Sequence, residues 1–425
     1  MKADIVIVGS GVAGLYCALN LPKERSIIIV TKSSAHRSDS YLAQGGICVL
    51  RDENDYDSFY DDTMKAGHYE NNADSVHIMI TSSQEVIGDL VSLGVRFEKN
   101  GEDFVYTREG AHSNHRILFH EDETGKEITS HLLEAARNRE NITIIENYTM
   151  VDLICEDNEC HGIIGHDENG VYSAIQADYT VLATGGIGGV FEHSTNYKHL
   201  TGDSIALALK YGIKLQHIDY IQIHPTTLYT EKAESREFLI SESVRGEGAI
   251  LLNSKGERFV NELLPRDVVA NAIFAEMKRE GSRYVWLSMA PIPKEEIQAH
   301  FPNICQHCLN EGYDVTKEPI PVVPSQHYFM GGVDVDRNSK TSMERLYAAG
   351  ETSCNGVHGR NRLASNSLLE SLVFAKRAAQ HIAEGYTELN NDTEIVIDES
   401  KYQNYKEEYK AAVLAAIEKE RLSHE

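Results

Sequence analysis

The chain opens with two continuous apolar runs separated by a stretch of helical spacing. Residues 3–8 (ADIVIV) form an uninterrupted apolar run that is typical of a buried strand. GSGVAG follows at 9–14, and LYCALNL continues with helical spacing until Pro22. A second buried strand, SIIIVTK, comes next. The pattern predicts a β-α-β unit with a G-x-G-x-x-G sequence at the turn from strand to helix.

Glycines at such a turn indicate a dinucleotide site. They permit the tight turn and let backbone N–H groups at the helix N-terminus reach a pyrophosphate. NAD-binding proteins usually end the second strand in Asp or Glu, which binds a ribose hydroxyl, whereas this strand ends in Thr31 and Lys32. No second well-placed G-x-G-x-x-G follows downstream. The sequence therefore does not fit a typical NAD dehydrogenase, and the ribose contact is expected to be made differently.

Later segments continue the alternation of helices and strands. Helical spacing covers 74–93 and 126–139, and a strand-like stretch covers 142–154. At 178–191, DYTVLATGGIGGVF runs from a buried strand directly into paired glycines. Those glycines are open to two interpretations, a mobile loop or a second backbone approach to the cofactor, and the repeated strand-to-glycine geometry favours the second.

Changes in pattern predict four segments. Proline-containing loops and mixed elements mark 218–325 as an inserted domain between a first part at 1–217 and its continuation at 326–388. Residues 389–425 form a C-terminal segment with one charged amphipathic helix, which we interpret as a surface helix.

Composition narrows the class of protein. The 425 residues are 41% hydrophobic and carry a net charge of −25, which opposes binding to nucleic acid or anionic membrane surfaces. No apolar run reaches the length of a membrane span, and the first apolar run lacks signal-peptide flanks, so a cytoplasmic protein is expected.

The seven cysteines are scattered, as in proteins of a reducing compartment. Cys305 and Cys308 form a lone C-x-x-C, for which a helix or loop pair is favoured over a metal site, and no metal is predicted.

Eight ordered motifs point to one family. They are GSGVAG, SYLAQGGI, LATGGIGG, QIHPTTLY, SVRGEGAIL, LPRDVV, QHYFMGGV and AAGETSCNGVHGRNRLASNSLLE. Together they resemble the flavoprotein family of succinate dehydrogenase and fumarate reductase, and most closely its branch that oxidises L-aspartate. The resemblance spans residues 3 to 385 and implies an α/β fold. In that fold a discontinuous Rossmann-type FAD-binding domain carries an inserted α+β capping domain, followed here by a short C-terminal helix, and the dicarboxylate site lies between the two domains.

The resemblance also implies which residues contact FAD. They are Gly9, Ser10, Gly11, Val12, Ala13, Gly14, Lys32, Asp39, Ser40, Tyr41, Leu42, Ala43, Gln44, Gly45, Gly46, Asp203, Glu351, Ser367 and Leu368. Members that attach FAD covalently carry a histidine at the position of Asp39. A bound but non-covalent FAD is therefore expected.

Five further positions match those that bind the substrate carboxylates: His224, Ser241, Glu242, His327 and Arg362. A guanidinium suits the task because it stays charged and grips a carboxylate through two hydrogen bonds. Taken alone, the HGRNR segment around Arg362 would be interpreted as a surface turn. Arg266 resembles the family's proton donor and acceptor, although free arginine is far too basic for that role at neutral pH. Its local context, Pro265 before a helical stretch, equally predicts a helix start.

Glu109, in TREGAH, is the residue that separates the branches of the family. Succinate- and fumarate-converting members carry an apolar residue in this loop, whereas L-aspartate brings an ammonium group on C2. A carboxylate here would attract that ammonium. Succinate has no ammonium, so with succinate bound the buried carboxylate would have no partner, which disfavours binding. Ala111 replaces a glycine of the loop of the aspartate-oxidising branch. We expect little effect from it, provided that the backbone there does not need a positive φ.

The implied reaction is FAD-dependent oxidation of L-aspartate to iminoaspartate by hydride transfer to flavin N5, with reoxidation by oxygen or fumarate. In the family this oxidation is the first step of de novo NAD biosynthesis, and its product feeds quinolinate synthase. Two alternatives stay open, a soluble fumarate reductase that also oxidises succinate, and a catalytically silent flavin-binding subunit. Longer members of the branch continue into a C-terminal helical domain beyond the point where this sequence ends.

Overall fold

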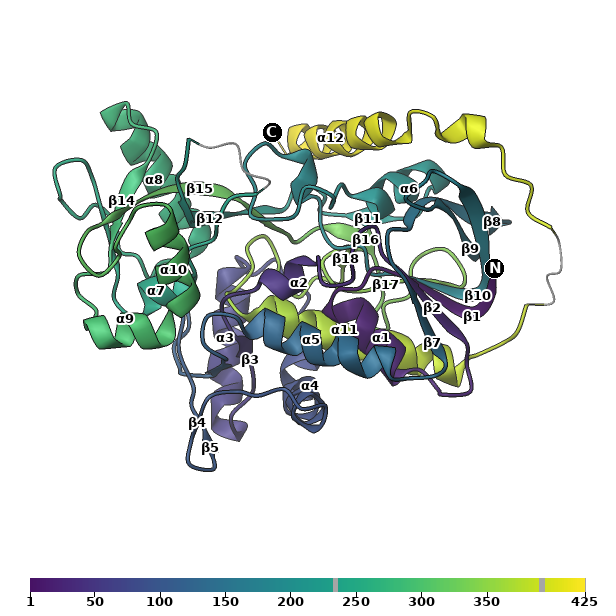
Figure 1. Cartoon of the computed structure of the whole chain (residues 1–425), viewed down its shortest axis with the longest axis horizontal. Coiled ribbons are helices and arrows are strands. Elements are labelled where there is room, and N and C mark those ends of the chain that lie inside the picture. Colours follow the sequence, from purple (N-terminus) through teal and green to yellow (C-terminus); the bar gives the residue numbers. More distant parts are fainter. Residues whose placement is uncertain (232–235, 390–393, 425) are drawn as a thin grey trace.

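A mixed sheet forms the centre of the larger part of the molecule (Figure 1). The computed structural model describes residues 1–231, 236–389 and 394–424. Within these residues the sheet has the strand order β7-β2-β1-β10-β9-β8, and β17 pairs with the carboxyl end of β10. The strands are β1 (Lys2–Val8), β2 (Ile27–Val30), β7 (Ile142–Ile145), β8 (Thr149–Glu156), β9 (Glu159–His166), β10 (Tyr172–Leu182) and β17 (Leu346–Ala348). β7, β2, β1, β10 and β17 are parallel, whereas β9 and β8 form an antiparallel extension.

Helices cover both faces of this sheet, because successive residues of a buried parallel strand point to opposite faces. Ile5 and Ile7 of β1 belong to the core on one side, and Val6 and Val8 belong to the core on the other. The first side carries α1 (Val12–Asn20), α4 (Ala73–Ser92), α5 (Thr124–Arg137) and α11 (Asn366–Glu384). The second side carries α6 (Asp203–Tyr211) and α12 (Tyr405–Ser423). The predicted β-α-β opening is confirmed, and β1 and β2 place its glycine turn at their carboxyl ends.

The C-terminal helix is more than a solvated surface helix. Val413 and Ile417 of α12 are buried against the core on the α6 side of the sheet. The Tyr409 hydroxyl donates a hydrogen bond to the Val151 carbonyl of β8 at 2.6 Å. Packing therefore fixes the position of α12 along the molecule. None of the helices in the described residues is long and apolar enough to span a membrane.

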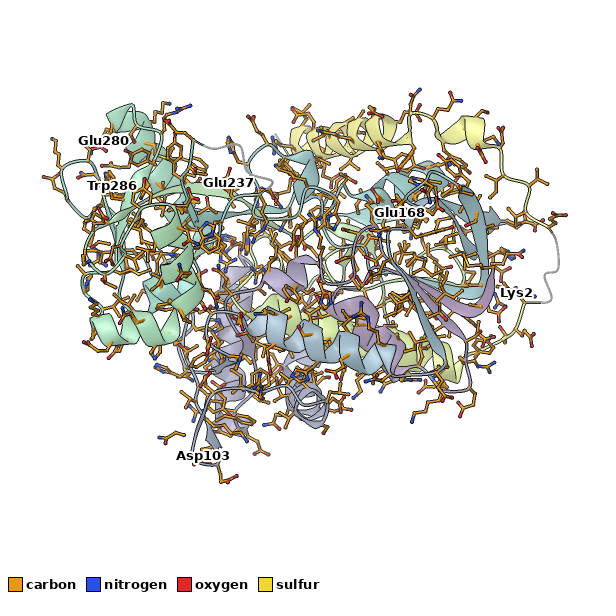
Figure 2. The ribbon with its side chains drawn as sticks, in the orientation of Figure 1. Lys2, Asp103, Glu168, Glu237, Glu280 and Trp286 are labelled. Atoms are coloured by element: carbon orange, nitrogen blue, oxygen red, sulfur yellow. The ribbon has the colours of Figure 1, made fainter. Side chains whose placement is uncertain are left out.

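A second, antiparallel sheet forms the smaller end of the molecule, with strand order β12-β15-β14-β13. Its strands are β12 (Ile221–Leu228), β13 (Ile250–Leu252), β14 (Val285–Ser288) and β15 (Ile320–Phe329), accompanied by α7 (Glu242–Gly246), α8 (Arg266–Glu280), α9 (Lys294–His300) and α10 (Pro302–Asn310). These elements enclose their own hydrophobic core. Figure 2 shows Glu280 and Trp286 at this end and Lys2 at the opposite end, beside the main sheet. This core, from Leu228 to Val322, lies within 218–325, the segment that the sequence predicts as a capping domain.

Shorter elements complete the described part of the chain. They are α2 (Asp39–Leu42), α3 (Tyr56–Ala66), β3 (Ile47–Cys48), β4 (Lys99–Asn100), β5 (Asp103–Phe104), β6 (Ile117–Leu118), β11 (Leu215–Gln216), β16 (Gly332–Asp334), β18 (Ser353–Cys354) and the 3₁₀ turns Glu53–Asp55, Gly188–Val190 and Glu399–Tyr402.

Most predicted elements occur near their predicted bounds. The helices expected at 74–93 and 126–139 are α4 and α5. The strand-like stretch 142–154 is two strands, β7 and β8, because Asn147 between them adopts φ 56° and breaks the extended backbone. Cys305 and Cys308 lie on α10, where Cys308 is buried in the core of the capping sheet. The C-x-x-C is thus a helix pair.

Candidate active site

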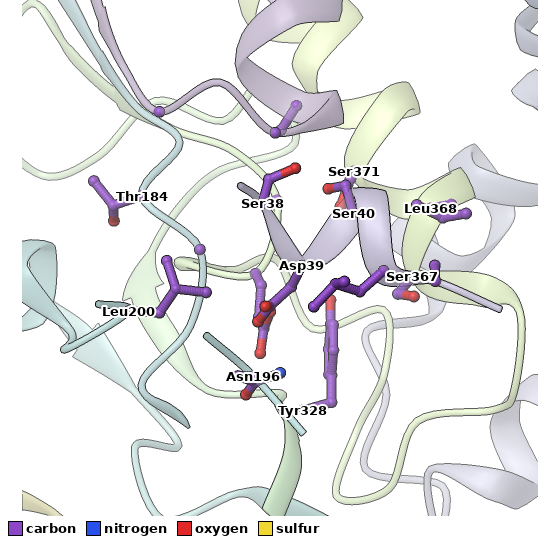
Figure 3. A pocket seen from close by; sticks show the side chains of 18 of the residues that line it. Ser38, Asp39, Ser40, Thr184, Asn196, Leu200, Tyr328, Ser367, Leu368 and Ser371 are labelled. Carbon is purple, nitrogen blue, oxygen red and sulfur yellow. The ribbon is translucent and has the colours of Figure 1, made fainter. Parts of the chain in front are cut away.

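One large cavity lies between the carboxyl ends of the main sheet, the loop around α2 and the capping sheet. Its volume is about 1630 Å³, including its mouth to solvent. Figure 3 shows Asp39, Asn196, Leu200 and Tyr328 around the same open space. All seven residues expected at the substrate end line it: Glu109, His224, Ser241, Glu242, Arg266, His327 and Arg362.

The glycine turn forms one wall of the cavity. Gly9 has φ +120°, and a Cβ there would lie 2.0 Å from the Ala183 carbonyl oxygen. A Cβ on Gly14 would lie 2.0 Å from the Gly9 carbonyl oxygen, so only glycine lets α1 approach β1 this closely. The N-terminus of α1 thereby faces the cavity, where the Val12 N–H donates to Ser40 Oγ at 3.2 Å and the positive end of the helix favours an anion.

Most of the expected FAD contacts also line the cavity, and three do not. Those that line it are Gly9, Ser10, Gly11, Ala13, Lys32, Asp39, Ser40, Leu42, Ala43, Gln44, Gly45, Gly46, Asp203, Glu351, Ser367 and Leu368. Val12 is buried in the core, and Gly14 serves the packing of α1 on β1. The ring of Tyr41 packs edge-on against His36.

In this part of the cavity Lys32 is paired, and two carboxyl groups have raised pKa values. Lys32 forms an ion pair with Asp203 at 2.6 Å and donates to the His199 carbonyl at 2.9 Å. The end of the second strand therefore carries a paired lysine in place of the acidic residue that binds ribose in NAD-binding proteins. Burial, with the nearby Asp39 charge, raises the pKa of Glu351 to about 8. Burial likewise raises the pKa of Asp39 to about 7.

Two buried acceptors of the loop around α2 have no hydrogen-bond partner among the described residues, Asp39 Oδ2 and Gln44 Oε1. Buried acceptors of this kind usually find a donor. An elongated cofactor that carries hydroxyl and ring N–H donors would supply it, and the glycine turn would take its pyrophosphate. The residues present therefore fit FAD.

The substrate end brings two arginines to one carboxylate network. Arg266 donates from Nε to Glu242 Oε2 at 2.5 Å and from Nη1 to Gln222 Oε1 at 2.8 Å. Arg362 lies over the Tyr328 ring at 4.6 Å, and its Nε has no partner among the described residues. Burial and the nearby Arg266 lower the pKa of Arg362 to about 10, so it remains a cation at neutral pH.

Two histidines complete the cation-rich side of this region. The ring centroids of His224 and His327 are 5.0 Å apart. His224 Nδ1 lies 3.1 Å from the Thr226 backbone, and its Nε2 has no partner among the residues that the structure describes. Burial and the arginine charges hold the pKa values of both histidines well below their usual range. Both are therefore neutral hydrogen-bonding groups.

Glu109 is buried beside this cluster. Its Oε1 accepts a hydrogen bond from Ser243 at 2.7 Å, and its Oε2 accepts one from Ser365 at 2.5 Å. Burial and the Glu242 charge raise the pKa of Glu109, against the effect of both serine donors. Gly45 makes room for it, because a Cβ there would lie 2.6 Å from Glu109 Oε1.

The expectation that Ala111 would be a minor substitution is wrong in its premise. Ala111 adopts φ 64°, the left-handed region in which a Cβ is strained. Its N–H donates to the Leu263 carbonyl of the capping part at 3.2 Å, which holds this conformation. At this position glycine would be less strained than the alanine that the chain carries.

The motifs contained other site residues that the sequence reasoning did not single out. Arg245 is fully buried and lies 3.5 Å from Glu242 Oε2, and its Nη1 donates to the Glu262 carbonyl. Its position three residues after Glu242 at a helix start was the available signal. Ser243 and Ser365 carried no signal of their own, because a serine in a loop has many uses.

The chain matches a family model described as FAD binding domain over residues 4–368. It is 52% identical to the L-aspartate oxidase of Clostridium perfringens over 402 residues, which cover 95% of this chain and 90% of that protein. It is 42% identical to the chloroplastic L-aspartate oxidase of Oryza sativa, covering 89% of this chain and 62% of that protein. Among solved structures, a variant of Escherichia coli quinol fumarate reductase superposes with a TM-score of 0.85 at 28% identity, covering 99% of this chain and 74% of that one.

Proposed function

The chain belongs to the L-aspartate oxidase family of FAD-dependent flavoproteins, and from this premise we propose that its cavity oxidises L-aspartate to iminoaspartate. FAD, held by the glycine turn, the loop around α2 and the segment from Glu351 to Leu368, supplies the hydride acceptor when bound. The observation that carries the proposal is the buried Glu109 carboxylate beside a cluster of arginines.

The charges of the substrate end match those of L-aspartate. Arg266 and Arg362 in the cavity wall, with Arg245 buried behind Glu242, contribute three positive charges, and Glu109 and Glu242 contribute two negative ones, a net of +1 with both histidines neutral. L-aspartate at neutral pH carries two carboxylates and one ammonium, a net of about −1, whereas succinate carries about −2. Aspartate leaves the buried region neutral, and succinate leaves it with an uncompensated charge.

The two ends of the substrate would be held by different groups. Arg362, with its unpaired Nε, and the neutral His224, with its unpaired Nε2, are available to carboxylates within the described residues. Arg266 is held by Glu242 and Gln222, so it stays charged and serves to attract and orient a carboxylate. Burial away from water strengthens each of these contacts and fixes the substrate in one orientation.

Glu109 would bind the ammonium group and receive its proton. Loss of a hydride from C2 and of one proton from the ammonium nitrogen converts the C2–N bond into a protonated imine. A carboxylate whose pKa is raised by burial is suited to hold that proton at Oε1 or Oε2. Ser243 and Ser365 donate to the same two oxygens and keep the carboxylate oriented.

Reoxidation and pathway are further parts of the proposal. We place oxygen or fumarate as the electron acceptor, since fumarate has the dicarboxylate shape that the site accepts. Iminoaspartate hydrolyses readily in water, so a consuming enzyme must act on it promptly. Quinolinate synthase, in the first steps of de novo NAD biosynthesis, is the consumer we propose.

Anaerobic mixing tests the proposal directly. The FAD-loaded protein is mixed with L-aspartate and, separately, with succinate, while the visible absorbance of the flavin is followed. Bleaching by L-aspartate and not by succinate is the expected result. Bleaching by succinate alone would contradict it in favour of a fumarate reductase, and bleaching by neither substrate would support the silent flavin-binding alternative.

A further inference from the structure

Three potential metal ligands from distant parts of the sequence meet where the C-terminal end of α12 reaches the junction of the two parts. They are Asp219, which lies between β11 and β12, and Glu420 and His424 on the last turn of α12 and just after it. One ligand atom from each lies within 4.8 Å of the others. Figure 1 shows this end of the chain above the junction between the main sheet and the capping sheet.

Packing delivers the ligands to this place. Val413 and Ile417 are buried, so α12 cannot rotate about its axis or slide along the sheet without losing them from the core. Glu420 and His424 are four residues apart, a spacing that puts both side chains on the same face of a helix. The site is therefore built by the fold rather than by a mobile tail alone.

An independent observation at Asp219 points to a ligand. The Asp219 side chain is only 9% exposed, and its Oδ1 has no hydrogen-bond partner among the described residues. A buried carboxylate oxygen without a donor destabilises the fold. In a protein with net charge −25, with Glu420 adding a second negative charge nearby, a cation would offset this cost.

The spacing is that of atoms on either side of an ion. His424 Nε2 lies 3.7 Å from Asp219 Oδ2, beyond hydrogen-bond distance. Two ligand atoms that are each about 2.1 Å from a tetrahedral ion lie about 3.4 Å apart. His424 is half-exposed, so a small rotation can bring its ring nitrogen to that distance.

We propose that Asp219, Glu420 and His424 bind a divalent cation of the Zn²⁺ class. Two carboxylates and one imidazole suit Zn²⁺, with water as the remaining ligand, whereas Mg²⁺ prefers oxygen ligands alone. The ion fastens α12 to the segment that leads into β12, the strand that carries His224. It thereby links the C-terminal helix to the start of the capping sheet, away from the catalytic cavity.

The test uses the tag-free, FAD-loaded chain in metal-free buffer, titrated with Zn²⁺ and with Mg²⁺ by calorimetry. His424→Ala and Glu420→Gln are compared with Glu418→Gln, an exposed neighbour on the same helix. One tight Zn²⁺ per chain is expected, weakened at least tenfold by the first two variants and changed less than twofold by the third. Zn²⁺ should raise the melting temperature of the wild type and of Glu418→Gln only.

Two results would overturn the proposal: no saturable Zn²⁺ binding by the wild type, or binding by His424→Ala as tight as that of the wild type. Mg²⁺ binding as tight as that of Zn²⁺ would also overturn it, because it would show that the His424 imidazole does not coordinate the ion. His424 is half-exposed, so its alanine variant is expected to fold. The flavin bleaching by L-aspartate provides a check that each variant retains the catalytic cavity.

Discussion

Ser365 donates its hydroxyl hydrogen to Glu109 Oε2 at 2.5 Å, and the same hydroxyl oxygen accepts the Gly46 backbone N–H at 3.2 Å. One side chain thus connects the loop around α2, the 105–116 loop and the segment that carries Arg362. Because the single hydroxyl hydrogen goes to Glu109, the contact favours the ionised carboxylate. The residue that we propose to distinguish aspartate from succinate is in this way tied to the loop expected to contact FAD.

Replacing Glu109 by Gln should separate the two substrates. The amide keeps the size of the side chain and can still accept from a serine, but it loses the charge that binds ammonium. Hydrogen bonds to charged groups contribute about 1.5–3 kcal/mol, so kcat/KM for L-aspartate should fall about 10- to 150-fold. Fumarate reduction should be kept. Steady-state kinetics with both substrates measure the effect, with Glu102→Gln, in the exposed turn between β4 and β5, as control. Equal loss of both activities would make Glu109 a structural residue.

The raised pKa of Glu109 predicts opposite pH dependence for the two reactions. Protonation removes the ammonium partner and changes the net charge of the region from +1 to +2, which suits a dianion. As pH falls through the Glu109 pKa, kcat/KM for aspartate should decrease and that for fumarate should hold or rise. The histidines stay neutral and add no step. Profiles that extend from acid to alkaline pH should show this step, above the ordinary pKa range of a glutamate, in the wild type and lack it in Glu109→Gln. A step that persists in the variant would assign it to another group.

The sequence predicted those site residues whose role follows from the motif in which each of them lies. The glycine turn follows from local backbone requirements, and the residues expected to bind the substrate carboxylates come from motifs at strand ends and loops that meet at one cavity. Contacts between motifs were not predictable. Ser243 reaches Glu109 from more than a hundred positions away in the sequence, and no local pattern encodes that meeting. The same is true of Asp219 and His424.

Asp39 predicts how FAD is attached. We propose that its carboxylate stands where other family members carry the histidine of a covalent bond, and its Oδ1 accepts the Tyr197 backbone N–H at 3.0 Å. A carboxylate is a weaker nucleophile than the imidazole that forms the bond in those members, so we expect no covalent link to the flavin at Asp39. Acid precipitation should therefore release all of the yellow cofactor into the supernatant. Colour that remains in the washed, denatured pellet would contradict a non-covalent FAD.

Ala111 predicts a stabilising substitution. An L-residue in the left-handed region costs about 1–2 kcal/mol, whereas glycine adopts it freely. Glycine also makes the unfolded chain more flexible, which offsets about 0.4–1 kcal/mol of that gain. Ala111→Gly should therefore raise the free energy of unfolding by about 0.5–1 kcal/mol, measured from the midpoint of urea denaturation with FAD bound.

The matched control for that variant is Ala411→Gly, at an exposed position of α12. There φ is helical, so the same substitution should lower the free energy of unfolding by about 1 kcal/mol. The two variants remove the same methyl group and differ chiefly in backbone conformation. Opposite signs would attribute the effect to the φ of Ala111, and destabilisation by both would mean that the Ala111 methyl group is needed for packing next to Glu109.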